Sequence, residues 1–423
     1  MSKKVLTLVL AVMMLVGMCA IPASASGEKV QIALWHMYGE SAGLNDVVDQ
    51  FNASQDEVEV IPSYYATHDD LLTKLQVTAS TGSSERPNVI LIDCVKASAV
   101  DQIFPLVDLT AYLDQSENLE FDDFYPVFQK FSKNTDGEIV SLHGWSNCLI
   151  LYYNKALFRE AGLDPEVAPK SWEEIIEYGK KLTNADKGIW GYEPGIVRDN
   201  SNEGYSWEWQ ALTMTAGGKI WNEDQTQILF NDKPAVEALQ FWHDCIYEHK
   251  ITTMSPPENG FENGYVAMQV GGTWMGGQYT AALGDDLGCS VLYGKDGNAA
   301  TCAGGEHLMI VQSDKEHEDA SWKFLSYIFS EEPNAAIARN NGMIPTRVSI
   351  AQSDSYADVL EIPYIKTTVE MVENYGITRC TRPDYPTFSS IAYNYIQAVL
   401  YDTMTPEDAI AQFAAEVTST LGL

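Results

Sequence analysis

Residues 149–162 read LILYYNKALFREAG, a stretch in which a strand turns directly into a helix. The apolar run Leu149–Tyr153 predicts a buried strand, and a helix is expected from Lys155. Gly162 stands where a glycine commonly follows the end of a helix, because glycine adopts the left-handed conformation there without strain. Residues 171–174, SWEE, form a capping box that opens the next helix. An α/β unit therefore begins in the middle of the chain.

A first α/β unit precedes this stretch. Apolar residues near the N-terminal end alternate between strand-like runs and the i, i+3, i+4, i+7 spacing of a helix face. The order β-α-β-α-β predicts a parallel sheet with right-handed crossovers, and ligands of such sheets bind beyond the carboxyl ends of the strands. The strands are expected at Val30–Trp35, Val58–Tyr64 and Val89–Ile92, and the helices around Leu44–Phe51 and Leu71–Leu75.

Further elements follow on the C-terminal side. Two more strands are expected at Val266–Val270 and Leu308–Val311, and two amphipathic helices at Ala320–Phe329 and Thr405–Leu421. The chain contains no internal repeat and no stretch with the composition of a flexible linker. Two α/β units without a linker predict two lobes joined by several short crossings.

The first 25 residues have the pattern of a secretory signal peptide. Residues 3–4 are lysines, the apolar run Val5–Cys19 follows, and Ala23–Ala25 is a small-residue cleavage site. The run falls short of the roughly 18–20 apolar residues that a membrane span needs. Cleavage after Ala25 and export are therefore expected, with a lipid anchor at Cys19 as the alternative.

The composition limits the possible partners. The 423 residues suffice for two or three domains, and the formal net charge is −33. So acidic a chain is not suited to nucleic acid or to an anionic membrane. Six cysteines remain beyond the signal region without a C-x-x-C pair, so neither a zinc ribbon nor a thioredoxin site is indicated. Buried free thiols are expected, although Cys289 and Cys302 are close enough in sequence to make a disulfide conceivable.

Enzyme motifs are weak. Residues 39–43 read GESAG, which matches the G-x-S-x-G nucleophile elbow between a strand and a helix. However, no earlier strand exists to supply the oxyanion N–H, so Ser41 is expected to cap the helix instead. His243 and His249 are six residues apart, which is no zinc spacing. No pattern singles out the paired carboxylates of a glycosidase. We therefore expect no enzyme activity, no metal and no cofactor.

Taken together, the motifs resemble those of the extracellular solute-binding proteins of carbohydrate-type ABC importers, in particular the maltose-, multiple-sugar- and glycerol-phosphate-binding branches. The resemblance covers nearly the whole chain beyond the signal region. Residues 151–164 are its most recognisable segment. The other matching segments are Val30–His36, Pro169–Glu174, Gly264–Met268, Gly272–Trp274, Ala303–Glu306, Ala320–Phe324 and Asn341–Pro345.

The resemblance implies a two-lobed, type II periplasmic-binding-protein-like α/β fold with a ligand cleft between the lobes. It also implies a small carbohydrate ligand, the permease subunits of an importer as partners, and a monomer. Three crossings are expected, near Asn147, Ala300 and Ile350. The lobes are then expected to comprise residues 26–147 with 300–350, and residues 148–299 with 351–423.

Sugars present apolar C–H faces and a rim of hydroxyls, which suit an indole face and polar side chains respectively. Ten tryptophans are available, although any of them could be core packing. Trp35 is expected to support the site from behind, His36 could be a satisfied cleft histidine, and Asp93 could cap the next helix. The candidate ligand-binding residues are Trp35, His36, Tyr38, Glu40, Asp93, Trp145, Asn147, Trp207, Trp209, Trp274, Gly305, Glu306, Arg382 and Tyr385.

Two ligand classes stay open. The glycerol-phosphate branch shares several motifs, and Arg379 and Arg382 could clamp a phosphate in the segment where that branch has its phosphate arginine. Neither falls cleanly on that position when Pro386 is aligned, and the negative charge gives an anion little long-range attraction. The abundance of tryptophan favours a neutral oligosaccharide over glycerol 3-phosphate or a glycerophosphodiester.

Overall fold

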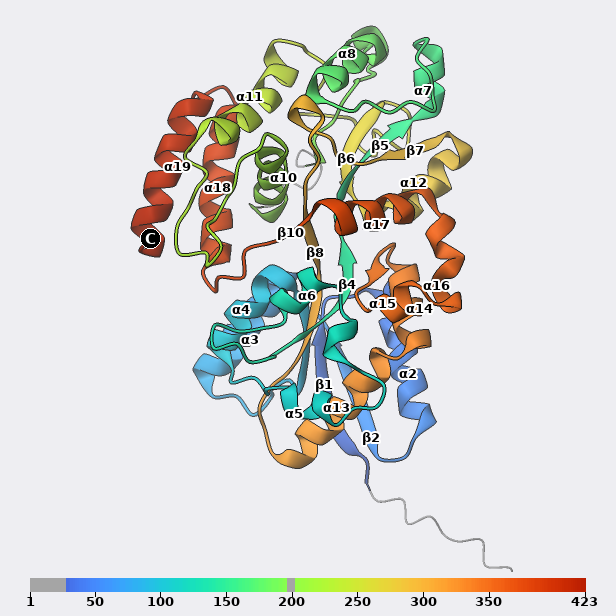
Figure 1. Ribbon diagram of the computed structural model, residues 1–423, viewed down its shortest axis with the longest axis vertical. Helices are drawn as coiled ribbons and strands as arrows, with labels where there is room; N and C mark the ends of the chain where they lie inside the picture. Colours follow the sequence, from blue (N-terminus) through green and yellow to red (C-terminus); the bar gives the residue numbers. More distant parts are fainter. Residues whose placement is uncertain (1–27, 196–201) are drawn as a thin grey trace, which may run out of the picture.

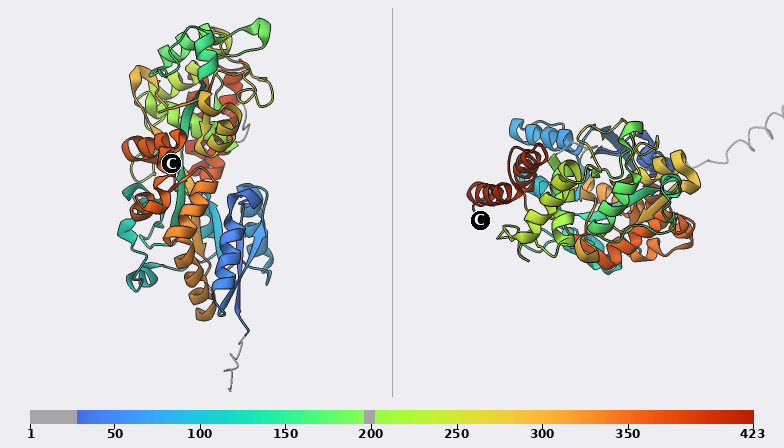
Figure 2. Two further views of the ribbon diagram at one scale, coloured as in Figure 1. Left: turned by 90° about the vertical axis from the view of Figure 1, so that its right-hand side faces the viewer. Right: turned by 90° about the horizontal axis from the view of Figure 1, so that it is seen from above.

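The computed structural model describes residues 28–195 and 202–423. The predicted signal peptide, residues 1–25, lies outside this range. The molecule is elongated, with one α/β body above another (Figure 1). The side view in Figure 2 shows the same two bodies, with the C-terminus beside the region where they meet.

The first body is built on a mixed sheet. In the described part of the chain its strand order is β2-β1-β3-β8-β4-β9, with β10 paired to β8. β1 runs parallel to both β2 and β3, as predicted, whereas β8 is antiparallel to β3 and β4. Its strands are β1 (Val30–His36), β2 (Val58–Tyr64), β3 (Val89–Asp93), β4 (Leu142–Asn147), β8 (Thr301–Ile310), β9 (Ile344–Pro345) and β10 (Gly376–Thr378).

Helices cover this sheet. The predicted apolar face of α2 is confirmed, because Leu44, Val47, Val48 and Phe51 are all buried. α3 begins at a side-chain cap, with Thr67 accepting a hydrogen bond from the Asp70 N–H. The helices of this body are α2 (Leu44–Ser54), α3 (His68–Thr81), α4 (Cys94–Ile103), α5 (Thr110–Asp114), α6 (Pro126–Phe131), α13 (Lys315–Ile328), α14 (Glu331–Asn340), α15 (Val348–Ala351) and α16 (Asp354–Ala357).

The second body contains a smaller sheet in the order β6-β5-β7. β5 (Leu149–Asn154) pairs antiparallel with β6 (Met268–Gly272) and β7 (Leu287–Ser290). The strand-to-helix stretch folds as predicted: Asn154 caps α7 (Lys155–Glu160), and Gly162 has a φ of 73°. The other helices are α8 (Trp172–Leu182), α10 (Asn202–Thr215), α11 (Lys233–Tyr247), α12 (Gly276–Leu283), α17 (Pro363–Tyr375), α18 (Tyr385–Leu400) and α19 (Pro406–Leu421).

Several local predictions need correction. β6 begins two residues later than expected, and β8 is longer and starts at Thr301, where small residues hid the strand pattern. Ser41 does not cap α2. It lies in a short 3-10 turn, and the residue at the helix start is Gly43, whose φ of 76° suits glycine. In contrast, all six described cysteines are free, as predicted.

The two sheets meet end to end. β4 ends at Asn147 and β5 begins at Leu149, so that Cys148 alone separates a strand of one sheet from a strand of the other. The chain returns to the first sheet at β8, and after α17 it adds β10 to that sheet before it continues into α18. The ends of strands from both sheets therefore face a common region. Over the ranges described, every helix is too short or too polar to cross a membrane.

Candidate ligand-binding cleft

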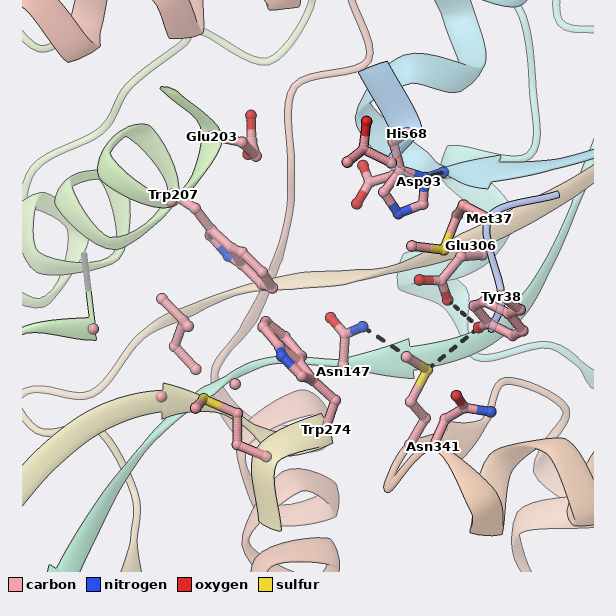
Figure 3. A pocket seen from close by; sticks show the side chains of 18 of the residues that line it. Met37, Tyr38, His68, Asp93, Asn147, Glu203, Trp207, Trp274, Glu306 and Asn341 are labelled. Atoms are coloured by element: carbon pink, nitrogen blue, oxygen red, sulfur yellow. Dashed lines mark hydrogen bonds between the residues drawn. The ribbon is translucent and has the colours of Figure 1, made fainter. Parts of the chain in front are cut away.

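A cavity of about 780 Å³ lies where the two sheets meet. Residues beyond the carboxyl ends of β1 and β3 form one side, and residues of α10 and the end of β6 form the other (Figure 3). The position agrees with the rule that parallel strands present ligand sites at their carboxyl ends. Six predicted residues line this cavity: Tyr38, Asp93, Asn147, Trp207, Trp274 and Glu306.

Two tryptophans form its aromatic wall. The rings of Trp207 and Trp274 are stacked, with centroids 5.7 Å apart and an interplanar angle of 21°. Trp207 is only 7% exposed and its Nε1 donates to the Cys302 carbonyl at 3.0 Å, whereas Trp274 is 45% exposed. A Cβ at Gly272 would lie 2.1 Å from the Trp274 ring, so glycine is needed there. Trp274 therefore offers the larger free apolar surface.

A buried polar pair lies opposite. The Tyr38 hydroxyl donates to a carboxyl oxygen of Glu306 at 2.7 Å, and both residues are buried (Figure 3). Burial raises the pKa of Glu306 to about 8; the hydrogen bond from Tyr38 opposes this effect, and the charge of Asp93 adds a smaller increase. Glu306 is therefore largely protonated at neutral pH, and its carboxyl group can donate as well as accept a hydrogen bond.

Asp93 has two roles that sequence reasoning treated as alternatives. Its carboxylate accepts from the Val95 N–H at 2.8 Å and so caps α4, as one interpretation predicted. It also lines the cavity and lies 3.6 Å from a guanidinium nitrogen of Arg379. Burial would raise the pKa of Asp93, but nearby positive charge, chiefly that of Arg379, outweighs it and lowers the pKa. Asp93 is therefore an anion.

Of the described basic residues that line the cavity, His68 is neutral and Lys96 is paired with a carboxylate. His68 accepts from the Asp93 N–H at 3.1 Å, and burial lowers its pKa to about 4, so that it is neutral at pH 7. The Lys96 ammonium lies 2.6 Å from Asp69. The sequence analysis did not predict three of these wall residues: His68, Asp69 and Lys96. They lie in the first turn of the helices that follow β2 and β3, so the expectation of a site beyond the strand ends, which identified Asp93, could have found them as well.

Other wall residues were also missed. Glu203 precedes Trp207 by one helical turn on α10, so helix geometry places both on one face. Asn341 and Met343 come from the segment after α14, and the Asn147 amide approaches the Met343 sulfur at 3.9 Å. Gln269 belongs to β6. Asn341 and Met343 belong to a matching segment and Gln269 directly follows another, but nothing in the sequence shows that their side chains face a cavity.

Some predicted residues on and just after β1 also lie away from the cavity wall. Trp35 packs on Tyr65 in a separate apolar cluster, with ring centroids 5.4 Å apart, which fits its expected supporting place behind the strand. His36 is buried and its pKa is lowered to about 4, chiefly by burial. Glu40 is exposed on the turn that follows. The cavity wall contains Met37 and Tyr38, which follow the end of β1, and none of the residues of β1 itself.

The remaining predicted residues contact other parts of the protein and do not line the cavity. The Trp145 Nε1 donates to the Asn334 carbonyl at 2.9 Å, and Trp209 packs against Phe230 and Phe413. Gly305 has a φ of 131°, and a Cβ there would meet the Trp145 carbonyl oxygen at 1.9 Å. Arg382 pairs with Asp384 at 2.6 Å. Tyr385 is buried and donates to Glu203 at 3.1 Å, so it reaches the cavity only through that carboxylate.

A family model described as bacterial extracellular solute-binding protein matches residues 46–363. The chain belongs to this family. A curated relative of this solute-binding protein is the sn-glycerol-3-phosphate-binding periplasmic protein UgpB of Pectobacterium atrosepticum, 26% identical over 256 residues. That match covers 59% of this chain and 57% of the relative, so the chain spans less than two thirds of the relative's length.

Solved structures of sugar-binding proteins have the same fold. The cyclic α-maltosyl-1,6-maltose binding protein from Arthrobacter globiformis superimposes with a TM-score of 0.80 at 28% identity, covering 93% of this chain and 99% of that one. Maltose-bound MalE3 of T. maritima gives a TM-score of 0.79 at 25% identity, covering 92% of this chain and all of that one. The predicted periplasmic-binding-protein-like α/β fold is therefore confirmed.

Proposed function

We propose that this protein is the extracytoplasmic substrate-binding component of an ABC importer, and that it binds a neutral oligosaccharide. The observation that carries the proposal is the cavity of about 780 Å³ with the exposed Trp274 ring on one side and Glu306, Tyr38 and Asn147 on the other. An indole face covers the apolar face of a pyranose, and the polar groups bond its hydroxyls. Cavities of this size hold ligands larger than a single sugar ring.

The comparisons support this ligand class. Two structures of similar fold bind maltose or a cyclic maltosyl-maltose, according to their descriptions. The curated relatives are described as binding sn-glycerol 3-phosphate, which keeps that compound in the test as the rival ligand. The whole family is described as extracellular, which supports export by way of the predicted signal peptide at residues 1–25.

We further propose that residues 26–147 with 300–350 and residues 148–299 with 351–423 are two lobes that close on the ligand. Three crossings, near Asn147, Ala300 and Ile350, would join them. Tyr38, Asp93 and Glu306 lie with the first sheet, whereas Trp207 lies on α10 and Trp274 follows β6 of the second sheet, and this arrangement supports the mechanism. A ligand that touches both sets binds the closed form better, and this differential affinity drives closure. The closed form is what a permease would recognise, and no reaction is involved.

The test is a thermal-shift and calorimetric screen of the mature protein. The panel contains maltose, maltotriose, a cyclic maltosyl-maltose, glycerol, sn-glycerol 3-phosphate and inorganic phosphate. A ligand present at a hundred times its dissociation constant should stabilise the protein by about 2.7 kcal/mol. Neutral oligosaccharides are expected to raise the melting temperature. A shift produced only by phosphorylated compounds would refute the proposed ligand class.

A further inference from the structure

Arg379 is a buried cation that lies behind the cleft. It follows β10, the short strand paired to β8, and is 2% exposed. Its guanidinium lies 4.5 Å from the centre of the Trp207 ring, on the side chain that lines the cavity. A buried guanidinium next to a ligand cavity would ordinarily favour an anionic ligand, because it needs a counter-charge and bonds carboxylates and phosphates well.

Two carboxylates of the protein already supply that counter-charge. Asp93, at the end of β3, lies 3.6 Å from Arg379, and Glu203 of α10 contacts the other terminal guanidinium nitrogen. Both carboxylates are fixed by further bonds. Asp93 accepts from the Val95 N–H, and Glu203 accepts from the hydroxyls of Tyr385 and Ser389, each at 3.1 Å. Asp93 and Glu203 line the cavity and Arg379 lies behind them.

Among the residues that the structure describes, the remaining charges at the cavity do not favour an anion either. The Lys96 ammonium is held by Asp69 at 2.6 Å, and His68 is neutral at pH 7 because burial lowers its pKa. Within the described wall of the cavity, a phosphate group would therefore meet two fixed carboxylates, and neither Lys96 nor His68 would be a free cation for it. Like charges placed together without water cost affinity and so exclude a ligand.

We propose that Asp93 and Glu203 act as built-in counter-anions of Arg379, and that this ion triad makes the cleft select uncharged polyhydroxylated ligands and reject phosphate-bearing ones. The inference rests on the proposed function, since it concerns the same cleft and narrows its ligand class. It assigns to Arg379 and Glu203 a role in specificity through charge compensation, without direct contact between Arg379 and the sugar.

The test leaves the Arg379 guanidinium without its two counter-charges, because nearly isosteric substitutions replace both carboxylates by neutral amides. In the double variant Asp93→Asn/Glu203→Gln, asparagine can still cap α4. Calorimetry with sn-glycerol 3-phosphate and with inorganic phosphate should show at least tenfold tighter binding than the wild type. Adding Arg379→Gln should remove the gain. The matched control is Glu117→Gln/Glu120→Gln, which changes the net charge equally at two exposed residues away from the cavity wall.

Three results would overturn the inference. They are a folded double variant with no gain in anion affinity, an equal gain in the control, and a wild type that binds glycerol 3-phosphate within tenfold of its best sugar. If the double variant does not fold, the wild-type comparison and Glu203→Gln alone decide. A wild type that binds no sugar in the panel would refute the proposed function. The anion measurements would still report separately on the triad.

Discussion

Replacing Trp274 tests the aromatic wall most directly. A tryptophan side chain can bury up to about 250 Å². Because Trp274 is 45% exposed without ligand, about 110 Å² remains for a ligand to cover. At about 25 cal/mol per Å², complete coverage would contribute about 2.8 kcal/mol, and coverage of one face about half of that. Trp274→Ala should therefore weaken oligosaccharide binding by about 10- to 100-fold.

The assay is titration calorimetry with the tightest-binding sugar of the panel, together with a thermal melt of the unliganded variant. The matched control is Tyr265→Ala, since Tyr265 is 43% exposed and lies away from the cavity wall. We expect the control to bind as the wild type does and the Trp274 variant to stay folded. Binding within twofold of the wild type in a folded Trp274→Ala protein would refute the stacking argument, and loss of folding would show that Trp274 is a core residue.

Three further outcomes are expected. Glu306 has a folded pKa of about 8 against 4.5 unfolded, so its stabilising contribution is complete below pH 4.5 and is lost as the pH rises through 8. In Glu306→Gln, the free energy of unfolding in urea should therefore vary less with pH between 5 and 8, by a few kcal/mol at most. A variant whose free energy of unfolding depends on pH as steeply as that of the wild type would contradict this. Ser41 caps no helix, so Ser41→Ala should change the free energy of unfolding by less than about 0.5 kcal/mol; Ser41-dependent esterase turnover would contradict the binding-only role. Small-angle scattering should show a smaller radius of gyration with saturating sugar, and an unchanged radius with binding confirmed would count against lobe closure.

The sequence predicted those parts of the fold whose signals are local. Periodicity located β2, β3 and the apolar face of α2, because burial on one side of an element leaves a regular pattern. Thr405 and Ser171 cap their helices as expected. The start of β8 could not be predicted. Its small residues Ala303–Gly305 carry no apolar pattern, because segments distant in the sequence pack closely against the two glycines and leave no room for larger side chains.

The site was harder to predict because proximity to a cleft does not fix where a side chain points. Trp207 and Trp209 are two residues apart on α10 and so face in different directions. One lines the cavity and the other packs against Phe413, and only the placement of the neighbouring helices decides which. Arg379 is a related case: the sequence left open a role as a phosphate clamp and could not show its partners, since Asp93 and Glu203 come from distant segments.

The connection through Cys148 limits how the molecule can move. Because one residue separates β4 from β5, few backbone dihedrals are available there to absorb a change of orientation between the sheets. Any such change must be close to a rotation about a fixed point, with little sliding. Pairs of spin labels placed on either side of Cys148 should then keep a constant separation in every state of the protein. Pairs placed across the opening of the cavity, farthest from that point, should show the largest change.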